Sequence, residues 1–273
     1  MERSESFARN FYKEEEIKRI FANNSLQNID VFAYDTVDST NTRAKLFAKN
    51  CDAGVSPAIF ISRAQSAGRG TRARTFESPP GAGLYLSILL PKKMIHGEPM
   101  HLTSYTAVIV SSAIERITEG KLAPKIKWVN DLVVCDKKLC GILTEAAFCE
   151  CKDAFFIVGI GINLKRGEHS PEVRSLMTSF EDLGIEVDEQ ALLLATVKSF
   201  FSSLDKFDSD EITEKYRSLS SLIGRRVAVS AGNDVITATA LTIDNDRAIV
   251  IKLDDGSIKK YFSGDVSLRP KGE

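Results

Sequence analysis

Apolar positions along the chain alternate between strand-like and helix-like spacing. Short apolar runs typical of strands occupy 29–34, 58–62, 84–90, 125–134, 138–148 and 154–164. Helical spacing is expected as one short amphipathic helix within 1–28, then at about 39–49, 100–118, 192–204 and 212–219. We also predict a hairpin that joins the strands 125–134 and 138–148 at Asp136-Lys137. The pattern therefore indicates a body built from both strands and helices.

The pattern changes near residues 220–223 to short alternating strands, which lie at 226–229, 236–243, 248–253 and 258–262. Four or five strands in about 50 residues predict a small barrel, which closes its own edges. A chain of 273 residues also favours two domains. We expect a helical lead-in at 1–28, a main domain at 29–220 and a barrel at 221–273.

Composition places the chain among ordinary globular proteins, with 43% hydrophobic and 27% charged residues. The net charge of −1 provides no overall field that would attract nucleic acid or an anionic membrane. Neither a secretory apolar segment nor a run of about 18 apolar residues is present, so we expect a cytoplasmic protein without membrane contact. Five cysteines, an odd number, predict reduced thiols, and the Cys149/Cys151 pair has too few neighbouring ligands for zinc.

The segment Gly68–Arg74 alternates glycines with Arg69, Arg72 and Arg74. Glycine lets backbone N–H groups approach an anion closely, and guanidinium groups pair with phosphate oxygens in bidentate fashion. A flexible, solvated surface loop is the alternative interpretation. The composition of the loop does not decide between the two.

Four further segments follow this loop in a set order: SPPGAGLY at 78–85, KWVND at 127–131, KLCGILTE at 138–145 and GIGIN at 159–163. In order and spacing they resemble the biotin protein ligase family, whose usual forms are GRGRxGRxW, SPxGxGLYxS, KWPND, K-x-x-GIL-x-E and G-x-GIN. The resemblance covers 38–164 closely and the barrel more loosely. It implies an α+β fold, with a mixed sheet backed by helices and then a small SH3-like barrel. Residues 29–220 would be the catalytic biotin/ATP-binding domain.

The resemblance also implies an activity. Such an enzyme makes biotinyl-5′-AMP from biotin and MgATP and transfers biotin to a lysine of a biotin carboxyl carrier protein, such as that of acetyl-CoA carboxylase. DNA and membrane partners are not expected, and a homodimer is an expectation from the resemblance alone. The site residues that the resemblance implies for biotin are Ser39, Thr40, Gln65, Gly68, Arg69, Lys138, Gly141, Gly159 and Gly161. Those implied for ATP are Arg69, Arg72, Arg74, Trp128, Asn130, Asn163 and Arg269, with Asp131 for Mg²⁺.

Each assignment has a plainer alternative. Lys138 and Arg69 would be the catalytic cations, although Lys138 could be an ordinary hairpin lysine. Ser39 could simply cap a helix, and Asn130 and Asp131 could simply form a turn. Trp128 is either a wall of the adenine pocket or a buried core aromatic.

The sequence departs from the family pattern at four positions, with Thr71 for arginine, Ala73 for glycine, Phe76 for tryptophan and Val129 for proline. Thr71 removes a charge expected to hold the adenylate. We hypothesise weaker retention of this intermediate unless Arg72 or Arg74 replaces that charge.

Four other functions remain to be weighed. A lipoate-type ligase shares the fold and the adenylate chemistry. A biotin-sensing repressor would need about 55 to 65 residues before the first strand for DNA-binding helices, and about 28 are present. A peptide-binding barrel would need more aromatics than Tyr261 and Phe262. A dinucleotide fingerprint starting at Gly159 fails because Leu164 stands where its third glycine belongs.

Overall fold

The main body is a seven-stranded mixed sheet with the order β1-β2-β3-β7-β6-β5-β4. The computed structural model describes residues 13–50, 55–149, 154–231, 234–262 and 267–270. The first two strands are parallel and the other neighbours antiparallel. The strands are β1 (Asp30–Val37), β2 (Ala58–Gln65), β3 (Gly83–Pro91), β4 (Lys125–Lys127), β5 (Asp131–Val134), β6 (Lys137–Phe148) and β7 (Ala154–Asn163).

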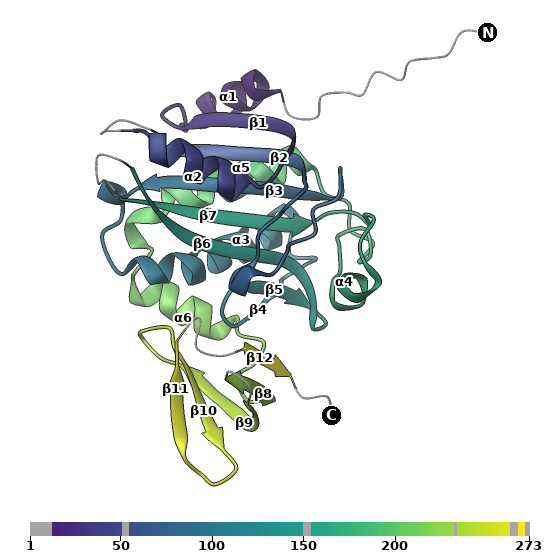
Figure 1. Ribbon diagram of the computed structural model, residues 1–273, viewed down its shortest axis with the longest axis vertical. Helices are drawn as coiled ribbons and strands as arrows, with labels where there is room; N and C mark the ends of the chain where they lie inside the picture. Colours follow the sequence, from purple (N-terminus) through teal and green to yellow (C-terminus); the bar gives the residue numbers. More distant parts are fainter. Residues whose placement is uncertain (1–12, 51–54, 150–153, 232–233, 263–266, 271–273) are drawn as a thin grey trace, which may run out of the picture.

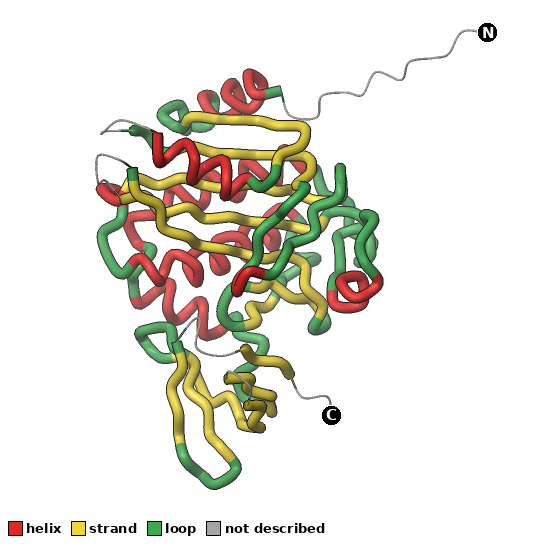
Figure 2. Tube along the Cα trace, in the orientation of Figure 1, coloured by secondary structure: helices red, strands yellow, loops and turns green. Residues whose placement is uncertain are grey.

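Helices cover the sheet unequally on its two faces (Figures 1 and 2). They are α1 (Glu14–Ala22), α2 (Thr40–Asn50), α3 (Leu102–Ile117), α4 (Pro171–Leu176), α5 (Glu189–Ser202) and α6 (Asp210–Ser218). Helix α3 packs on the sheet and against α5 and α6, while α2 packs on β2, β3, β6 and β7. The sequence pattern did not predict α4, which begins at the N-cap Ser170 with a proline at its first position.

The alternation of side chains along β3 explains why the two faces differ. Leu84, Leu86, Ile88 and Leu90 belong to the large hydrophobic core. Residues between them point to the other face, where part of the sheet packs against α2 and part remains for polar groups. One face therefore carries the core and the other has room for a site.

A second sheet follows, five-stranded and antiparallel, with the order β11-β10-β9-β8-β12. Its strands are β8 (Arg226–Ala231), β9 (Asp234–Ile243), β10 (Ile249–Leu253), β11 (Ile258–Tyr261) and β12 (Ser267–Pro270). Val227, Ile249 and Ile251 belong to the same hydrophobic core as the body of the protein. The predicted fold class, a mixed sheet backed by helices and followed by a small β unit, is confirmed.

The single strand predicted at 125–134 is wrong, because the structure divides it into β4 and β5 around a turn at 128–130. Asn130 stabilises this turn, since its Nδ2 donates to the carbonyl of Ile142 at 2.7 Å. The Trp128–Val129 peptide bond is cis. The predicted hairpin of β5 and β6 is confirmed, since the two strands pair antiparallel, but its two-residue turn is Cys135-Asp136 and not Asp136-Lys137, because Lys137 already belongs to β6.

The expectation of reduced thiols is wrong for Cys149, which is disulfide-bonded. Cys149 lies in the hydrophobic cluster that includes Ala44 and Ala48 of α2. Cys151 lies outside the described residues. Within the described ranges, no three His, Cys, Asp or Glu side chains gather to hold a metal ion.

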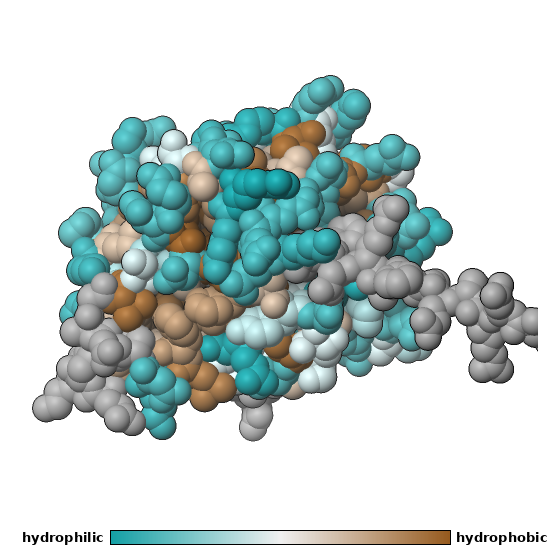
Figure 3. All heavy atoms as spheres, turned by 90° about the horizontal axis from the view of Figure 1, so that it is seen from above, coloured by the Kyte–Doolittle hydropathy of each residue, from teal (hydrophilic) through white to brown (hydrophobic). Residues whose placement is uncertain are grey.

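No described helix combines the length and the apolar character needed to cross a bilayer. The side of the molecule seen in Figure 3 is mainly hydrophilic, with apolar residues gathered in part of it.

Candidate functional site

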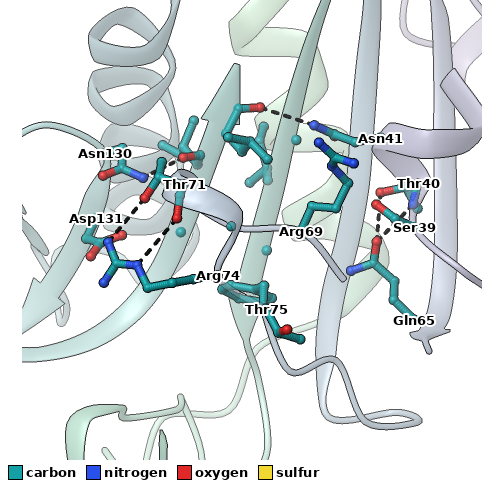
Figure 4. A pocket seen from close by; sticks show the side chains of 18 of the residues that line it. Ser39, Thr40, Asn41, Gln65, Arg69, Thr71, Arg74, Thr75, Asn130 and Asp131 are labelled. Carbon is teal, nitrogen blue, oxygen red and sulfur yellow. Dashed lines mark hydrogen bonds between the residues drawn. The ribbon is translucent and has the colours of Figure 1, made fainter. Parts of the chain in front are cut away.

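A cavity of about 130 Å³ opens on the α2 side of the sheet, between the start of α2, the strands β6 and β7, and residues 68–76 (Figure 4). We call residues 68–76 the arginine loop. Most of the residues that the sequence pointed to line this cavity. They are Ser39, Thr40, Gln65, Arg69, Arg74, Asn130, Asp131, Lys138, Gly141, Gly159 and Gly161.

The floor of the cavity is made of glycines on adjacent strands. Gly141 and Gly161 are register partners on β6 and β7. The ring of Phe76 lies on them, because a Cβ built on Gly161 would be 2.6 Å from Phe76 Cε1 and one on Gly141 would be 3.0 Å from Phe76 Cε2. The missing side chains thus let a flat group, here the ring of Phe76, lie directly against the backbone of the two strands.

One end of the cavity carries neutral hydrogen-bonding groups. Thr40 donates from its backbone N–H to Gln65 Oε1 at 2.9 Å, and Gln65 Nε2 donates to Ser78 Oγ at 2.8 Å. Ser87 Oγ donates to Asn41 Oδ1 at 2.6 Å, within the same network. These donors and acceptors suit a neutral polar ring, such as a urea group.

Ser39 stands at the start of α2, where its carbonyl accepts the first helical hydrogen bond, from Arg43 N–H at 3.0 Å. Its side chain lines the cavity and is almost fully buried. The helix-start position and the predicted ligand contact are therefore compatible at this one residue.

Glu145 anchors the arginine loop to the sheet. Its Oε1 pairs with Arg69 Nη2 at 2.8 Å and with Lys45 Nζ at 2.5 Å, and its Oε2 accepts from Asn41 Nδ2 at 2.9 Å. Burial alone raises the pKa of Glu145, but the hydrogen bonds from Lys45 and Asn41 and the charges of Lys45 and Arg69 outweigh it and lower the pKa. The carboxylate is therefore ionised and holds two cations beside the cavity.

The opposite end carries Lys138 and Asp131, whose Nζ and Oδ1 lie 2.7 Å apart. Lys138 Nζ also lies 5.3 Å from the centre of the Phe76 ring, at cation–π distance. Asn163 does not line the cavity, but its Nδ2 donates to the carbonyl of Lys138 at 3.1 Å and so fixes the backbone of that lysine.

Arg74 Nη2 lies 3.4 Å from Thr71 Oγ1, and both residues line the cavity. Arg72 is exposed, adopts a positive φ of 56° and does not contribute to the cavity wall. Gly68, the first residue of the loop, does not line the cavity, and a Cβ on it would be 2.2 Å from the carbonyl oxygen of Phe76. The loop thus presents Arg69 and Arg74 inward and Arg72 outward.

Trp128 lies in the hydrophobic core and not on the cavity wall. It is 6% exposed, and its indole Nε1 donates to the carbonyl of Arg247 at 3.1 Å. Trp128 is therefore a core aromatic, which is one of the two interpretations that the sequence left open. The side chain of Arg269 lies outside the described residues.

Known proteins show the same architecture. Residues 33–163 match the Biotin/lipoate A/B protein ligase family, and residues 222–269 match the Biotin protein ligase C terminal domain. The solved biotin protein ligase from Aquifex aeolicus, in complex with biotin and ATP, is 31% identical. It covers 88% of this chain and 99% of that one, with a TM-score of 0.73.

This chain belongs to the biotin protein ligase family. The Escherichia coli (strain K12) bifunctional ligase/repressor BirA is 29% identical over 77% of this chain. The matched part spans 65% of the length of BirA. The Mycobacterium tuberculosis (strain ATCC 25618 / H37Rv) biotin--[acetyl-CoA-carboxylase] ligase is 26% identical, over 90% of this chain and 91% of its own.

Three residues of this biotin protein ligase family site were not assigned from the sequence: Asn41, Ser87 and Glu145. Asn41 directly follows Ser39-Thr40, and Glu145 closes the segment that begins at Lys138. Their positions in these motifs were the available signal. Their partners, however, lie on other strands and helices, which motif spacing does not reveal.

Proposed function

We propose that this protein joins biotin to a lysine of a biotin carboxyl carrier protein, through biotinyl-5′-AMP formed from biotin and ATP. The observation that carries the proposal is one cavity with a neutral polar end, a glycine floor and a cationic end. The neutral end suits the ureido ring of biotin, and the cationic end suits two reacting anions.

In the first step, the biotin carboxylate attacks the α-phosphorus of ATP in line and pyrophosphate leaves. No side-chain nucleophile is needed, because the carboxylate itself forms the new bond to phosphorus. Lys138 and Arg69 offset the repulsion between the two anions. To do so, Lys138 exchanges Asp131, and Arg69 exchanges Glu145, for substrate oxygens.

Magnesium fits the donor set at the cationic end. Asp131 supplies one carboxylate in the cavity, and Mg²⁺ is commonly held by one or two carboxylates together with substrate phosphates. Asp131 and the ATP phosphates would hold the ion, which when bound supplies positive charge that offsets the charge of the phosphates.

In the second step, the carrier lysine amine attacks the acyl carbon of the mixed anhydride and AMP leaves. The cavity of about 130 Å³ is smaller than a typical small-molecule site of roughly 300–1,000 Å³, so the arginine loop must shift to admit both substrates. Closed again, the loop would keep water from the anhydride until the amine arrives.

A domain division at 220/221 and a homodimer stay predictions.

Lipoate is the alternative substrate, because the family model matched by residues 33–163 includes both kinds of ligase. The hydrogen-bonding end around Thr40 and Gln65 favours biotin, since a dithiolane ring has no N–H or C=O group to satisfy it.

The test is transfer of labelled biotin by the purified protein onto a carrier fragment in the presence of ATP and magnesium. We expect labelling of one carrier lysine, with AMP and pyrophosphate as products. A carrier whose acceptor lysine is replaced by arginine is the control. Tight calorimetric binding of lipoate, with none of biotin, would instead support the lipoate alternative.

A further inference from the structure

Arg247 is buried at the junction between the two sheets. It lies in the turn between β9 and β10, is 4% exposed and adopts a φ of 58°, a conformation that favours glycine. Its guanidinium donates to the carbonyls of His101 and Phe207, each at 2.8 Å, and to Ser104 Oγ at 2.7 Å. Burial lowers the pKa of Arg247 to about 10, so the group stays charged at neutral pH.

The backbone of Arg247 continues this contact towards the body of the protein. Its carbonyl accepts from the indole Nε1 of Trp128 at 3.1 Å. Val129, which follows Trp128 in the sequence, accepts through its carbonyl from the hydroxyl of Tyr216 on α6 at 2.8 Å. The turn 128–130 is thus held from outside by one hydrogen bond from the second sheet and one from α6.

The end of this turn and the start of β5 carry two cavity residues. Asn130 and Asp131 come two and three residues after Trp128, and both line the cavity. The carbonyl of Asn130 accepts a hydrogen bond from the backbone N–H of Ile142, and its side-chain Nδ2 donates to the Ile142 carbonyl. Asp131 forms an ion pair with Lys138. A shift of Trp128 would therefore displace the groups that the proposed function assigns to ATP and magnesium.

We propose that Arg247 is a positioning residue for the nucleotide half of the site. Its guanidinium fixes the β9–β10 turn against α3 and the 204–207 segment, and its carbonyl fixes Trp128 and thereby Asn130 and Asp131. This inference rests on the proposed function. It concerns ATP rather than biotin, because the neutral end of the cavity is built from α2 and β2, which contact neither Arg247 nor Trp128 through the bonds described.

The test uses the full-length protein and two variants. Arg247→Gly removes the guanidinium while the backbone keeps its conformation, and Trp128→Phe keeps an aromatic ring but loses the indole N–H. Arg225→Ala is the matched control, since it breaks another contact between the sheets, the Arg225–Asp136 ion pair at 2.7 and 2.8 Å, without touching the turn. Adenylate formation is measured against ATP and against biotin, and biotin binding by calorimetry.

We expect the KM for ATP to rise by roughly ten- to a hundredfold in both variants, as for small displacements of reacting groups. Biotin affinity should change less than about twofold, because its contacts lie at the other end of the cavity. Trp128 is the only tryptophan in the sequence, so its fluorescence reports on the turn directly. Arg247→Gly should shift the emission to longer wavelength, and Arg225→Ala should not.

The outcomes separate two failures. If the wild-type chain makes no biotinyl-adenylate, the proposed function fails, and the inference with it. Suppose that the wild type is active. If Arg247→Gly then leaves the KM for ATP unchanged, or raises the KM for ATP and the KM for biotin by the same factor, only the positioning role is overturned. Should Arg247→Gly fail to fold, Trp128→Phe decides, since an unchanged KM for ATP in that variant overturns the role.

Discussion

Arg69 and Glu145 form an ion pair beside the cavity, with Nη2 and Oε1 2.8 Å apart. The arginine belongs to the loop 68–76 and the glutamate to β6, so this contact ties the loop to the sheet. The side chain of Glu145 is 14% exposed, while that of Arg69 is 46% exposed. Because the arginine is the accessible partner, it can leave the glutamate for an anionic substrate at small cost in desolvation.

Glu145→Gln should reduce stability at neutral pH, because it leaves Lys45 and Arg69 without their carboxylate. The folded pKa of Glu145 is lowered from 4.5, so its ionised form contributes stability above that pH. This contribution disappears as the pH falls below about 4.5 and through the lower folded pKa. Urea unfolding between pH 7 and pH 3 should show that the wild type loses its higher free energy of unfolding relative to the variant. The same change of unfolding free energy with pH in both proteins would contradict this. Exposed Glu186→Gln is the control.

Lys138→Ala should slow adenylate formation by roughly a hundredfold or more, as expected when an electrostatic group is removed from a transition state. Biotin binding should be partly retained, because the polar end of the cavity is untouched. Pyrophosphate release at saturating biotin measures the effect. Lys137→Ala, an exposed lysine next to it, is the matched control. An unchanged rate in Lys138→Ala would remove this lysine from its assigned role.

Thr71→Arg should slow the escape of free biotinyl-adenylate, because it restores a cation at a position that lines the cavity. The release is followed by chromatography of the reaction without carrier. Thr71→Val, which adds no charge, should release the intermediate at the wild-type rate. Equal release from the wild type and Thr71→Arg would mean that Arg74 already supplies the missing charge.

Gly161→Ala should weaken biotin binding by roughly ten- to a hundredfold, the range expected for overpacking by one methyl group. The new Cβ would stand 2.6 Å from Phe76 Cε1 and would fill the floor of the cavity. Calorimetry with biotin measures the loss, and a cooperative thermal transition confirms that the variant is folded. A folded variant with wild-type affinity would show that biotin does not lie on this floor.

Much of the site could be predicted because its residues fall within local motifs. The glycines of β6 and β7, Lys138, and the Asn130-Asp131 pair were all assigned from short segments, and the cavity brings them together. The division of 125–134 into two strands was missed, although a turn at Asn130 and Asp131 was one of the two interpretations left open, since apolar spacing is the same for one long strand and for a tight hairpin of two short ones.

The sequence by itself determined the alternation that gives β3 one core face, and the order of motifs that marks the family. Tertiary structure alone decided the partners across the site. Asn41 meets Glu145 over a separation of 104 residues, Arg69 meets Glu145 over 76, and Trp128 meets Arg247 over 119. Periodicity and propensity act within a few residues, whereas these contacts depend on how whole strands and helices pack.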